Sequence, residues 1–422
     1  MKHLVFLVGG YYPNFSAVGN CAEKIINKLK DDYKITVISI KGDIESAKVE
    51  EFDGYKISRV ESQYQNKLNF LQNKIQNGGN VIYKLGVYLT RLANLGKFLL
   101  KKESIDSDLV HSYFDELSKL NSQNKIDAIV PLVFPFETVL AAIDFKKHIA
   151  DEVKLFPYLF DNFAASVSLH RFKINRAIKY NANVKLEGLL SKYSNTIFAM
   201  HPLTDYFKRH FNQDLVSKIT FLEHPLLFKR SSVTVNQCVD DKILLTYTGG
   251  LFKRVRTSDG ILDFLSEVNE VQKFKVNFYC FGNDLIAIDK YSKNSPEIFS
   301  NFGKVSRDIA ETAISNSDIL ISIGDMEGKQ LSSKIFDYLS MGKPILHFSY
   351  VEDCVNAKLL ERYPLAFVVC KRNKYSNLQI QESVRFIKQT SGSCMPFSEV
   401  EKLYPEALPI TSANIFKQKI ES

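Results

Sequence analysis

The sequence has no cysteine pairs with zinc-site spacing and no apolar run long enough to cross a membrane. Its 422 residues include six scattered cysteines and no C-x-x-C pair: Cys21, Cys238, Cys280, Cys354, Cys370 and Cys394. A disulfide framework or a structural zinc site needs closer, regular spacings. No uninterrupted apolar run approaches about 18 residues, and the run after Met1-Lys2-His3 is too short for a signal peptide. We therefore expect a reducing, cytoplasmic setting and no membrane span.

Acidic residues are missing from one segment, Ser62 to Lys102, which we call the basic insertion. It carries seven basic residues, namely Lys67, Lys74, Lys84, Arg91, Lys97, Lys101 and Lys102. Four apolar residues recur beside them at helical spacing: Ile82, Leu85, Leu89 and Leu92. A basic amphipathic helix can lie on an anionic membrane, which makes the inner face of the cytoplasmic membrane a candidate partner for residues 62–102. The alternative is a helical insertion packed on its domain with the lysines in water.

Length and composition predict a two-domain globular protein. A chain of 422 residues exceeds one ordinary core, so two domains of roughly 200 residues are expected. A hydrophobic content of 45% and a charged content of 24% are typical of globular proteins. The net charge of +8 favours anionic partners. Nucleic acid is a poor candidate, because the basic residues are not interleaved with aromatics in a recognisable module.

The first half alternates short apolar runs with helix-length segments. The run at residues 3–8 ends at Gly9-Gly10, as a buried parallel strand does where it meets a loop, and a helix is expected over about 20–30. Further strands are expected at 35–40, 127–133, 155–160, 195–200 and 218–222. This alternation predicts an α/β fold with a doubly wound parallel sheet.

A second set of alternating elements follows a polar segment at 228–241, which we interpret as the linker. Strands are expected at 243–248, 275–281, 318–323, 344–348 and 365–370. The predicted organisation is an N-terminal domain (1–227, with a helical insertion at about 62–122), the linker, a C-terminal domain (242–405) and a final helix (406–422) that returns to the first domain. Two tandem domains of this kind place the carboxyl ends of both sheets toward a shared cleft.

The stretch Glu327 to Phe348 combines an anion site with a carboxylate. A polar loop runs into Ser332-Ser333-Lys334, a helix follows, and Met341-Gly342-Lys343-Pro344 ends it. The start of a helix offers unpaired N–H groups that favour phosphate. Asp337 lies one turn further along the same face, where it could bind hydroxyl groups. Together these features suggest a nucleotide.

Two other loops are candidate ligand sites. The run from Thr248 to Arg256 is rich in glycine and cations, and it is expected to form a turn between a strand and a helix that begins near Thr257 or Ser258. Glycines let the backbone approach a ligand, and arginine binds phosphate through two hydrogen bonds. The loop from Phe302 to Arg307 either lines a base pocket or is an ordinary turn.

Three residues at strand ends of the first half are weaker candidates. Asp161 either faces the cleft or caps the next helix. His224 is expected to be structural, because no acid–base partner is identifiable beside it. His201 could reach an acceptor.

Five motifs of the second half form one pattern: Tyr247-Thr-Gly-Gly through Arg256, Gly282, Gly303-Lys-Val, SDILISIG (317–324) and SSKIFDYLSMGKPIL (332–346). With these motifs the second half resembles the donor-binding domain of glycosyltransferase family 4, retaining enzymes of GT-B architecture. The first domain agrees through its Gly9-Gly10-Tyr-Tyr-Pro turn and its Val18-Gly19-Asn20 helix start, and the match is loose between Ser62 and Ser122.

The resemblance implies a role for each matched residue. Arg256 would face the donor diphosphate, and the amides of Ser332, Ser333 and Lys334 would hold its distal phosphate. Asp337 would bind the ribose hydroxyls. The remaining implied donor contacts are the backbone of Val305 at the base, Gly19 facing the diphosphate, and the loop of Gly250 and Lys253. Arg256 and Asp161 are the candidate catalytic residues, although the resemblance itself assigns no role to Asp161.

Three positions depart from the family pattern. Lys329 stands where a sugar-binding glutamate is common, and the nearest carboxylates are Asp325 and Glu327. Many members have an arginine at the position of Gly250, for which Lys253 or Arg254 would substitute. Asp161 follows Phe160 where many relatives have a histidine. These departures favour nucleotide binding more than sugar binding.

The expected activity is transfer of a sugar, with retention, from a nucleotide diphosphate sugar to a hydroxyl of a glycan or lipid-linked acceptor in cell-surface polysaccharide synthesis. A UDP-sugar is the favoured donor. Neither a cofactor nor a metal is required, because Arg256, lysines and helix amides neutralise the leaving nucleotide. The alternatives are a sugar-nucleotide epimerase of the same architecture and a non-catalytic nucleotide-sugar-binding scaffold.

Overall fold

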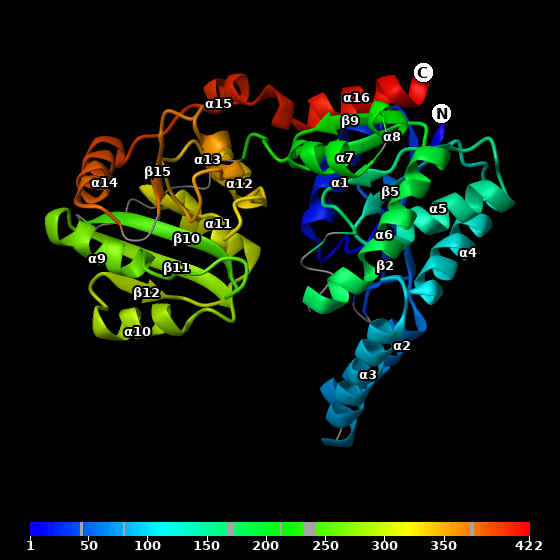
Figure 1. Ribbon diagram of the computed structural model, residues 1–422, viewed down its shortest axis with the longest axis horizontal. Helices are drawn as coiled ribbons and strands as arrows, with labels where there is room; N and C mark the ends of the chain where they lie inside the picture. The colour runs from blue at the N-terminus through cyan, green and yellow to red at the C-terminus, as the bar shows by residue number, and fades with distance from the viewer. Residues whose placement is uncertain are drawn as a thin grey trace. The chain divides into compact units, whose positions relative to one another are not determined.

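The chain forms two compact units. The computed structural model describes residues 1–42, 45–78, 81–164, 166, 173–211, 213–230, 242–371 and 375–422. The first unit comprises Met1–Pro225 and Pro409–Ser422, and the second comprises Leu226–Leu408 (Figure 1). Most of the predicted linker, residues 231–241, lies outside the described residues.

The first unit is built on a mostly parallel sheet. Its strand order is β3-β4-β2-β1-β5-β7-β8-β9, with β6 beside β5, and only the β3–β4 pair is antiparallel. The strands are β1 (His3–Val8), β2 (Lys34–Ile40), β3 (Val49–Phe52), β4 (Tyr55–Val60), β5 (Ala128–Val133), β6 (Lys154–Leu155), β7 (Tyr158–Leu159), β8 (Ile197–Met200) and β9 (Ile219–Leu222). All residues of β1 and β5 are buried, because helices cover both faces of such a sheet.

The helices of the first unit come from both ends of the chain. They are α1 (Ala17–Leu29), α2 (Gln63–Gln76), α3 (Val81–Leu100), α4 (Ser107–Gln123), α5 (Glu137–His148), α6 (Lys173–Tyr193), α7 (Thr204–His210), α8 (Gln213–Ser217) and α16 (Pro409–Glu421). The C-terminal helix α16 packs against α1. The ring of its Phe416 stacks on Phe198 of β8 at 3.9 Å between centroids. The last residues of the chain therefore belong to the core of the first unit.

The second unit has a fully parallel sheet with the order β12-β11-β10-β13-β14-β15. Its strands are β10 (Ile243–Leu251), β11 (Phe274–Gly282), β12 (Phe299–Asn301), β13 (Ile319–Ile323), β14 (Ile345–Ser349) and β15 (Ala366–Cys370). Its helices are α9 (Ile261–Val271), α10 (Ile286–Asn294), α11 (Arg307–Ser315), α12 (Ser333–Ser340), α13 (Val355–Leu360), α14 (Asn377–Thr390) and α15 (Phe397–Leu403). The strand order reverses direction at β10, where doubly wound sheets bind ligands.

Several boundaries differ from the sequence prediction. The strand expected at 155–160 is divided into β6 and β7, because Pro157 between them has no N–H for the sheet. The prediction that Gly249 and Gly250 lie in a turn is wrong, since β10 continues through both glycines to Leu251. The turn lies between Phe252 and Arg256. The helix expected from Thr257 or Ser258 begins at Ile261. Strands β3, β4 and β12 were not predicted. Strands β3 and β12 have only four and three residues and are largely unburied, whereas β4 is mostly buried.

Gly342 ends α12 in a backbone conformation that favours glycine. Its φ is +67°, and a Cβ at this position would lie 2.0 Å from the carbonyl oxygen of Met395. Its amide donates to the carbonyl of Leu339, closing the last turn of α12. The segment that carries Met395 therefore packs directly on the end of α12.

We predict that Gly342→Ala lowers the free energy of unfolding by about 2–5 kcal/mol, from the positive φ and the contact with Met395. Gly392→Ala is the matched control, because Gly392 has a φ of +75° and no atom near the position of a Cβ. The control should cost only the backbone term of about 1–2 kcal/mol. Urea unfolding of both variants measures the difference, and equal losses would contradict the contact.

Candidate functional site

The candidate site lies at the carboxyl edge of the second unit's sheet, where the loop 324–332 connects β13 to α12. The carboxylate of Asp325 organises this loop. Its Oδ1 accepts from the amide of Gln330 at 2.9 Å, and its Oδ2 accepts from the amides of Glu327 and Lys329, each at 3.2 Å. Asp325 is buried, so its hydrogen-bonding capacity is used inside the loop. It therefore positions the start of α12 and does not replace the missing glutamate.

The start of α12 presents fewer free amides than predicted. The amide of Ser332 donates to Oδ1 of Asn356 at 2.8 Å, so it is occupied. Within the described part of the chain, the structure gives no acceptor to the amides of Ser333 and Lys334, the first two residues of α12. The predicted phosphate contact of Ser332 is thus corrected, and Ser333 and Lys334 remain as donors for an anion.

Arg256 lies at the same edge, at the end of a tight loop after β10. Phe252 and Arg256 form an antiparallel bridge, and the carbonyl of Val255 accepts from the amide of Met326 at 2.8 Å. This contact joins the Arg256 loop to the loop before α12. The Nε of Arg256 is buried and has no hydrogen-bond partner among the described residues. A buried cationic donor without a partner is suited to an anionic ligand. Lys253, in the same loop, is exposed.

The groups beneath Arg256 are buried and uncharged. Burial, together with the nearby charge of Arg256, lowers the pKa of His347 to about 3. Burial also raises the pKa of Tyr338 in α12 to about 12. The hydroxyl of Tyr338 accepts a hydrogen bond from the amide of Thr248 in β10 at 3.2 Å. The buried groups next to Arg256 are therefore neutral and hydrogen-bonded, and they leave its positive charge unpaired.

Asp337 is already engaged by two cations. Its Oδ2 lies 3.1 Å from Nζ of Lys334, and its Oδ1 pairs with the guanidinium of Arg230. Arg230 also pairs with Glu311 of α11 at 3.0 Å and stacks over the ring of Phe228. A ribose would have to share this carboxylate. Sequence reasoning missed Arg230 because it lies in the predicted linker, where nothing in the sequence marks it.

Gly250 and Val305 flank the Arg256 loop. A Cβ on Gly250 would lie 2.7 Å from the ring of Phe252 and 3.4 Å from that of Phe281, so aromatic rings fill the space beside this glycine. Val305 is half-buried in the loop between β12 and α11. In that loop, Phe302 stacks on Tyr279 at 4.7 Å. This edge of the sheet therefore presents aromatic surface beside the cations.

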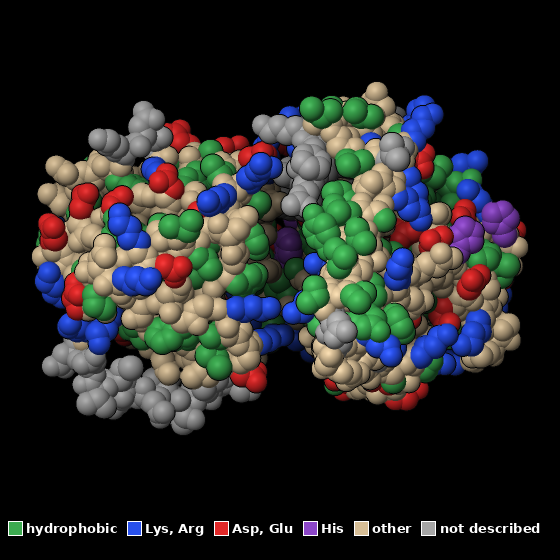
Figure 2. Space-filling model, turned by 90° about the horizontal axis from the view of Figure 1, so that it is seen from below, with side chains coloured by type: hydrophobic (Ala, Val, Ile, Leu, Met, Phe, Trp, Pro, Cys, Tyr) green, Lys and Arg blue, Asp and Glu red, His purple; other side chains and the backbone are tan. Residues whose placement is uncertain are grey.

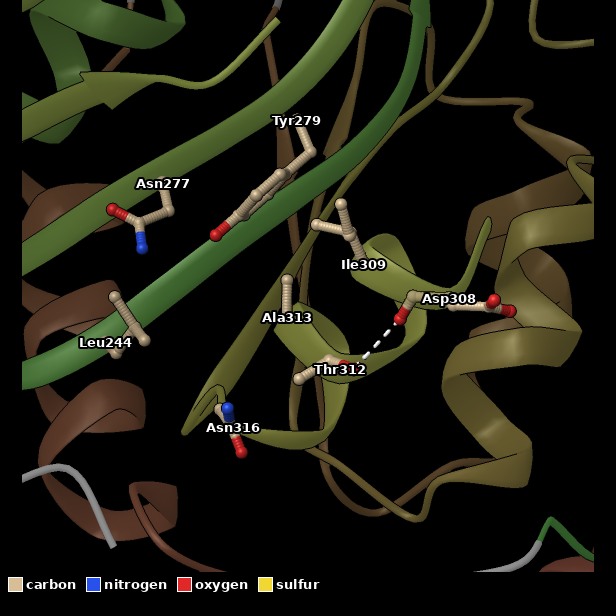
Figure 3. Close-up of a pocket in the computed structure, with 8 residues that line it drawn as sticks. All are labelled: Leu244, Asn277, Tyr279, Asp308, Ile309, Thr312, Ala313 and Asn316. Atoms are coloured by element: carbon tan, nitrogen blue, oxygen red, sulfur yellow. Dashed lines mark hydrogen bonds between the residues drawn. The ribbon is translucent and has the colours of Figure 1, made fainter. Parts of the chain in front are cut away.

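A cavity of about 380 Å³ lies in the second unit, between α11 and the face formed by β10 and β11 (Figure 3). Its lining residues are Leu244, Asn277, Tyr279, Asp308, Ile309, Thr312, Ala313 and Asn316. None of the predicted site residues lines it. It meets the candidate site's edge through Tyr279, on which Phe302 stacks.

The first unit holds the predicted residues Gly19 and Asp161. A Cβ on Gly19 would lie 2.2 Å from the carbonyl oxygen of Gly10, and the Gly19 amide donates to Oγ of Ser16 at 3.0 Å. Gly19 thus allows the turn after β1 to pack on α1, and its amide is occupied. Asp161 is exposed just beyond the carboxyl end of β7.

His224 has a partner that the sequence reading did not identify. Its Nδ1 lies 3.0 Å from Oε1 of Glu223, and its amide donates to the same oxygen at 2.7 Å. The pair follows β9, and the ring of His224 lies edge-on to Phe160. A histidine oriented by a carboxylate is a common acid–base arrangement. His201 instead stacks on Phe221.

The described residues contain no group of three or more acidic, histidine or cysteine side chains that could hold a metal ion. An Asp-x-Asp triplet does occur at Asp106-Ser107-Asp108, at the start of α4. There Oδ1 of Asp106 caps the helix by accepting from the amide of Asp108, and Asp108 pairs with Lys97 at 3.6 Å. This triplet therefore has a structural role.

We predict that acidification destabilises the protein through His347. The folded-state pKa of about 3 lies below the ordinary value of 6.5, so the unfolded chain takes up the proton first. The stabilisation is complete above pH 6.5 and is lost as the pH falls toward 3. Between pH 7.5 and 5 this group should cost about 2 kcal/mol, and His347→Asn should remove that part of the pH dependence. Urea unfolding at both pH values tests this, and parallel losses in the two proteins would contradict it.

No protein-family model and no curated protein matches the sequence. Solved structures do match over the whole chain. Sucrose-phosphate synthase from Thermosynechococcus elongatus is 7% identical with a TM-score of 0.62, and the match covers 99% of both chains. The apo lipopolysaccharide outer core galactosyltransferase WaaB is 12% identical with a TM-score of 0.58 over 99% of both chains. Anabaena HepE in complex with UDP and glucose is 9% identical with a TM-score of 0.57 over 100% of both chains. At these identities the likeness shows the fold alone, and it confirms the prediction that the chain has the GT-B fold.

Proposed function

We propose that the protein is a retaining glycosyltransferase of family 4 type that uses a nucleotide diphosphate sugar as donor. The observation that carries the proposal is the unpartnered, buried Nε of Arg256 beside the free amides at the start of α12. A cation and helix N–H groups at the carboxyl edge of a parallel sheet match the needs of a diphosphate. The GT-B fold of the chain supports this assignment.

The donor residues divide the nucleotide among them. Arg256 and Lys253 neutralise the diphosphate, and the amides of Ser333 and Lys334 hold its distal phosphate. Asp337 accepts from the ribose hydroxyls while it remains close to Lys334. The backbone at Val305 meets the base. A UDP-sugar is the favoured donor, since the similar structure of HepE is a complex with UDP and glucose.

The transfer requires little side-chain acid–base chemistry at the donor. The bond between the sugar's anomeric carbon and the diphosphate breaks, and the acceptor oxygen bonds to the same face of that carbon. The acceptor proton passes to an oxygen of the leaving diphosphate. Arg256 stabilises the charge that develops there. Asp161, in the first unit, is assigned to the acceptor side of the reaction.

The proposed acceptor is a hydroxyl of a glycan or a lipid-linked glycan in cell-surface polysaccharide synthesis. WaaB, a lipopolysaccharide galactosyltransferase of the same fold, supports this class of acceptor. A panel of nucleotide sugars tested with such acceptors, together with a screen for slow donor hydrolysis, examines the proposal directly.

A sugar-nucleotide epimerase is the second candidate, because the Glu223–His224 pair supplies the acid–base group that such a reaction needs. Conversion of the donor in the absence of acceptor would identify it. A non-catalytic scaffold would bind nucleotide without turnover, or would not bind it.

We predict that Arg256→Met weakens UDP binding about 10- to 100-fold, the loss expected for a charge-assisted hydrogen bond. Arg385→Met on α14 is the control, because it removes the same charge from an exposed position of the same unit. Isothermal titration calorimetry measures both. Unchanged affinity in Arg256→Met, with wild-type protein that binds UDP, would remove Arg256 from the site.

We also predict that Asp161→Asn lowers the rate of sugar transfer at least tenfold while the dissociation constant for UDP stays within twofold of wild type. The reason is that Asp161 belongs to the unit that does not carry the donor residues. Initial rates with the best donor and acceptor, together with calorimetry, check this. A transfer rate equal to wild type would restrict Asp161 to a structural role.

A further inference from the structure

The helices α2 and α3 form a hairpin that extends from the body of the first unit (Figure 1). They pack on each other closely, since a Cβ on Gly86 in α3 would lie 3.2 Å from the side chain of Leu71 in α2. Lys179 of α6 anchors the C-terminal end of α3 to the rest of the unit. Its ammonium group donates to the carbonyl of Phe98 and lies over the Phe98 ring. The hairpin is therefore anchored at one end and free to present its outer faces.

The outer face of α3 is apolar and exposed. The side chains that share this face are Val81 (78% exposed), Ile82 (72%), Leu85 (54%), Tyr88 (59%), Leu89 (54%), Leu92 (45%) and Leu99 (42%). Figure 2 views this end of the molecule and shows hydrophobic side chains gathered in a band with basic side chains beside it. The alternative expected from the sequence, with this stripe packed on the domain, is therefore wrong.

The charged residues of the basic insertion itself have one sign. The insertion from Ser62 to Lys102 has seven basic and no acidic residues. Lys84 and Arg91 are exposed on α3, two turns apart on one flank of the apolar face. On α2, Lys67 and Lys74 are exposed on either side of Phe70, which is itself 58% exposed. No carboxylate of the described residues pairs with these four cations.

We propose that the α2–α3 hairpin is a membrane-docking element that lies in the interface of an anionic lipid bilayer. The apolar face of α3 would enter the acyl boundary, and the flanking cations would contact lipid phosphates. Among the described residues, no helix combines the length and apolar character that a crossing requires, so α3 lies on the bilayer instead of spanning it.

Charge selects a bilayer over a second copy of the chain. A symmetric contact through this face would bring two sets of cations together with no carboxylate in either insertion to offset them. An anionic membrane offers both the apolar layer and the negative charge. The proposal does not depend on the proposed sugar transfer, because it uses no residue of the donor site.

The absence of tryptophan from the chain provides a direct probe. In Leu89→Trp the indole would be the sole tryptophan, on the outer face of α3. We expect its emission to shift to shorter wavelength, and to be quenched by brominated lipid, when the full-length protein meets vesicles containing phosphatidylglycerol. Leu378→Trp on α14, where the native side chain is 63% exposed, is the control and should show neither change. A Leu89→Trp probe that stays in water on such vesicles would overturn the proposal.

Two charge variants test the electrostatic part. Lys84→Gln with Arg91→Gln should reduce partitioning onto anionic vesicles about 25-fold at low salt, roughly fivefold for each cation removed. The difference in partitioning between the wild-type protein and this variant should become smaller as the salt concentration is raised. Lys290→Gln with Lys293→Gln, both exposed on α10 of the second unit, makes the same change in net charge and should leave partitioning unchanged.

The apolar part is tested with Leu85→Glu and Leu89→Glu together, which should abolish vesicle binding while urea unfolding stays cooperative. Cooperative unfolding shows that this variant is folded. Vesicle binding by the double glutamate variant equal to wild type would overturn the proposal. The proposal would also be overturned if the wild-type protein did not bind vesicles and light scattering showed it to be a dimer that these substitutions dissociate.

Discussion

The carboxylate of Asp325 holds the loop on which the candidate site depends. It accepts hydrogen bonds from three backbone N–H groups of the same loop. Asp325 is buried, so these bonds are shielded from water. The loop so formed delivers α12 with its first amides free, and the same loop bonds to the Arg256 loop through Met326 and Val255. A single buried side chain thus sets the relative position of the helix start and the guanidinium. The basic and aromatic residues at this edge of the sheet are arranged around that fixed point.

Neutral support beneath the site extends the same principle. His347 is held uncharged by burial, and Tyr338 links α12 to β10 by hydrogen bonds. A phenolate at Tyr338 would compete with a ligand for Arg256, and a protonated His347 would add a second, unpaired positive charge to the interior. The second unit therefore presents positive charge at this edge of its sheet and keeps His347 and Tyr338 neutral. Two carboxylates lie nearby: Asp325 is buried and bonded to backbone amides, and Asp337 is paired with Arg230 and Lys334.

Much of the fold could be predicted from the sequence, since buried parallel strands are continuous apolar runs. The runs at β1, β5, β13 and β14 needed no further information. The sequence could not reveal where β10 ends, because Gly249-Gly250 has the composition of a turn but the register of a strand. Partners from distant segments were also beyond reach. Neither the Asn356 bond to Ser332 nor the Arg230 pair with Asp337 leaves a local pattern, as each joins residues that only the fold brings together.

The C-terminal helix makes the second unit an insertion within the first. Phe416 of α16 has no exposed surface and stacks on Phe198, so the core of the first unit is completed by the last residues of the chain. During synthesis the first unit's sheet emerges early, but its covering helix emerges after the whole second unit. The strands of the first unit are therefore made well before the helix that covers them. Until α16 has been made, the apolar surface that it covers has to be kept from aggregating while residues 226–408 are synthesised.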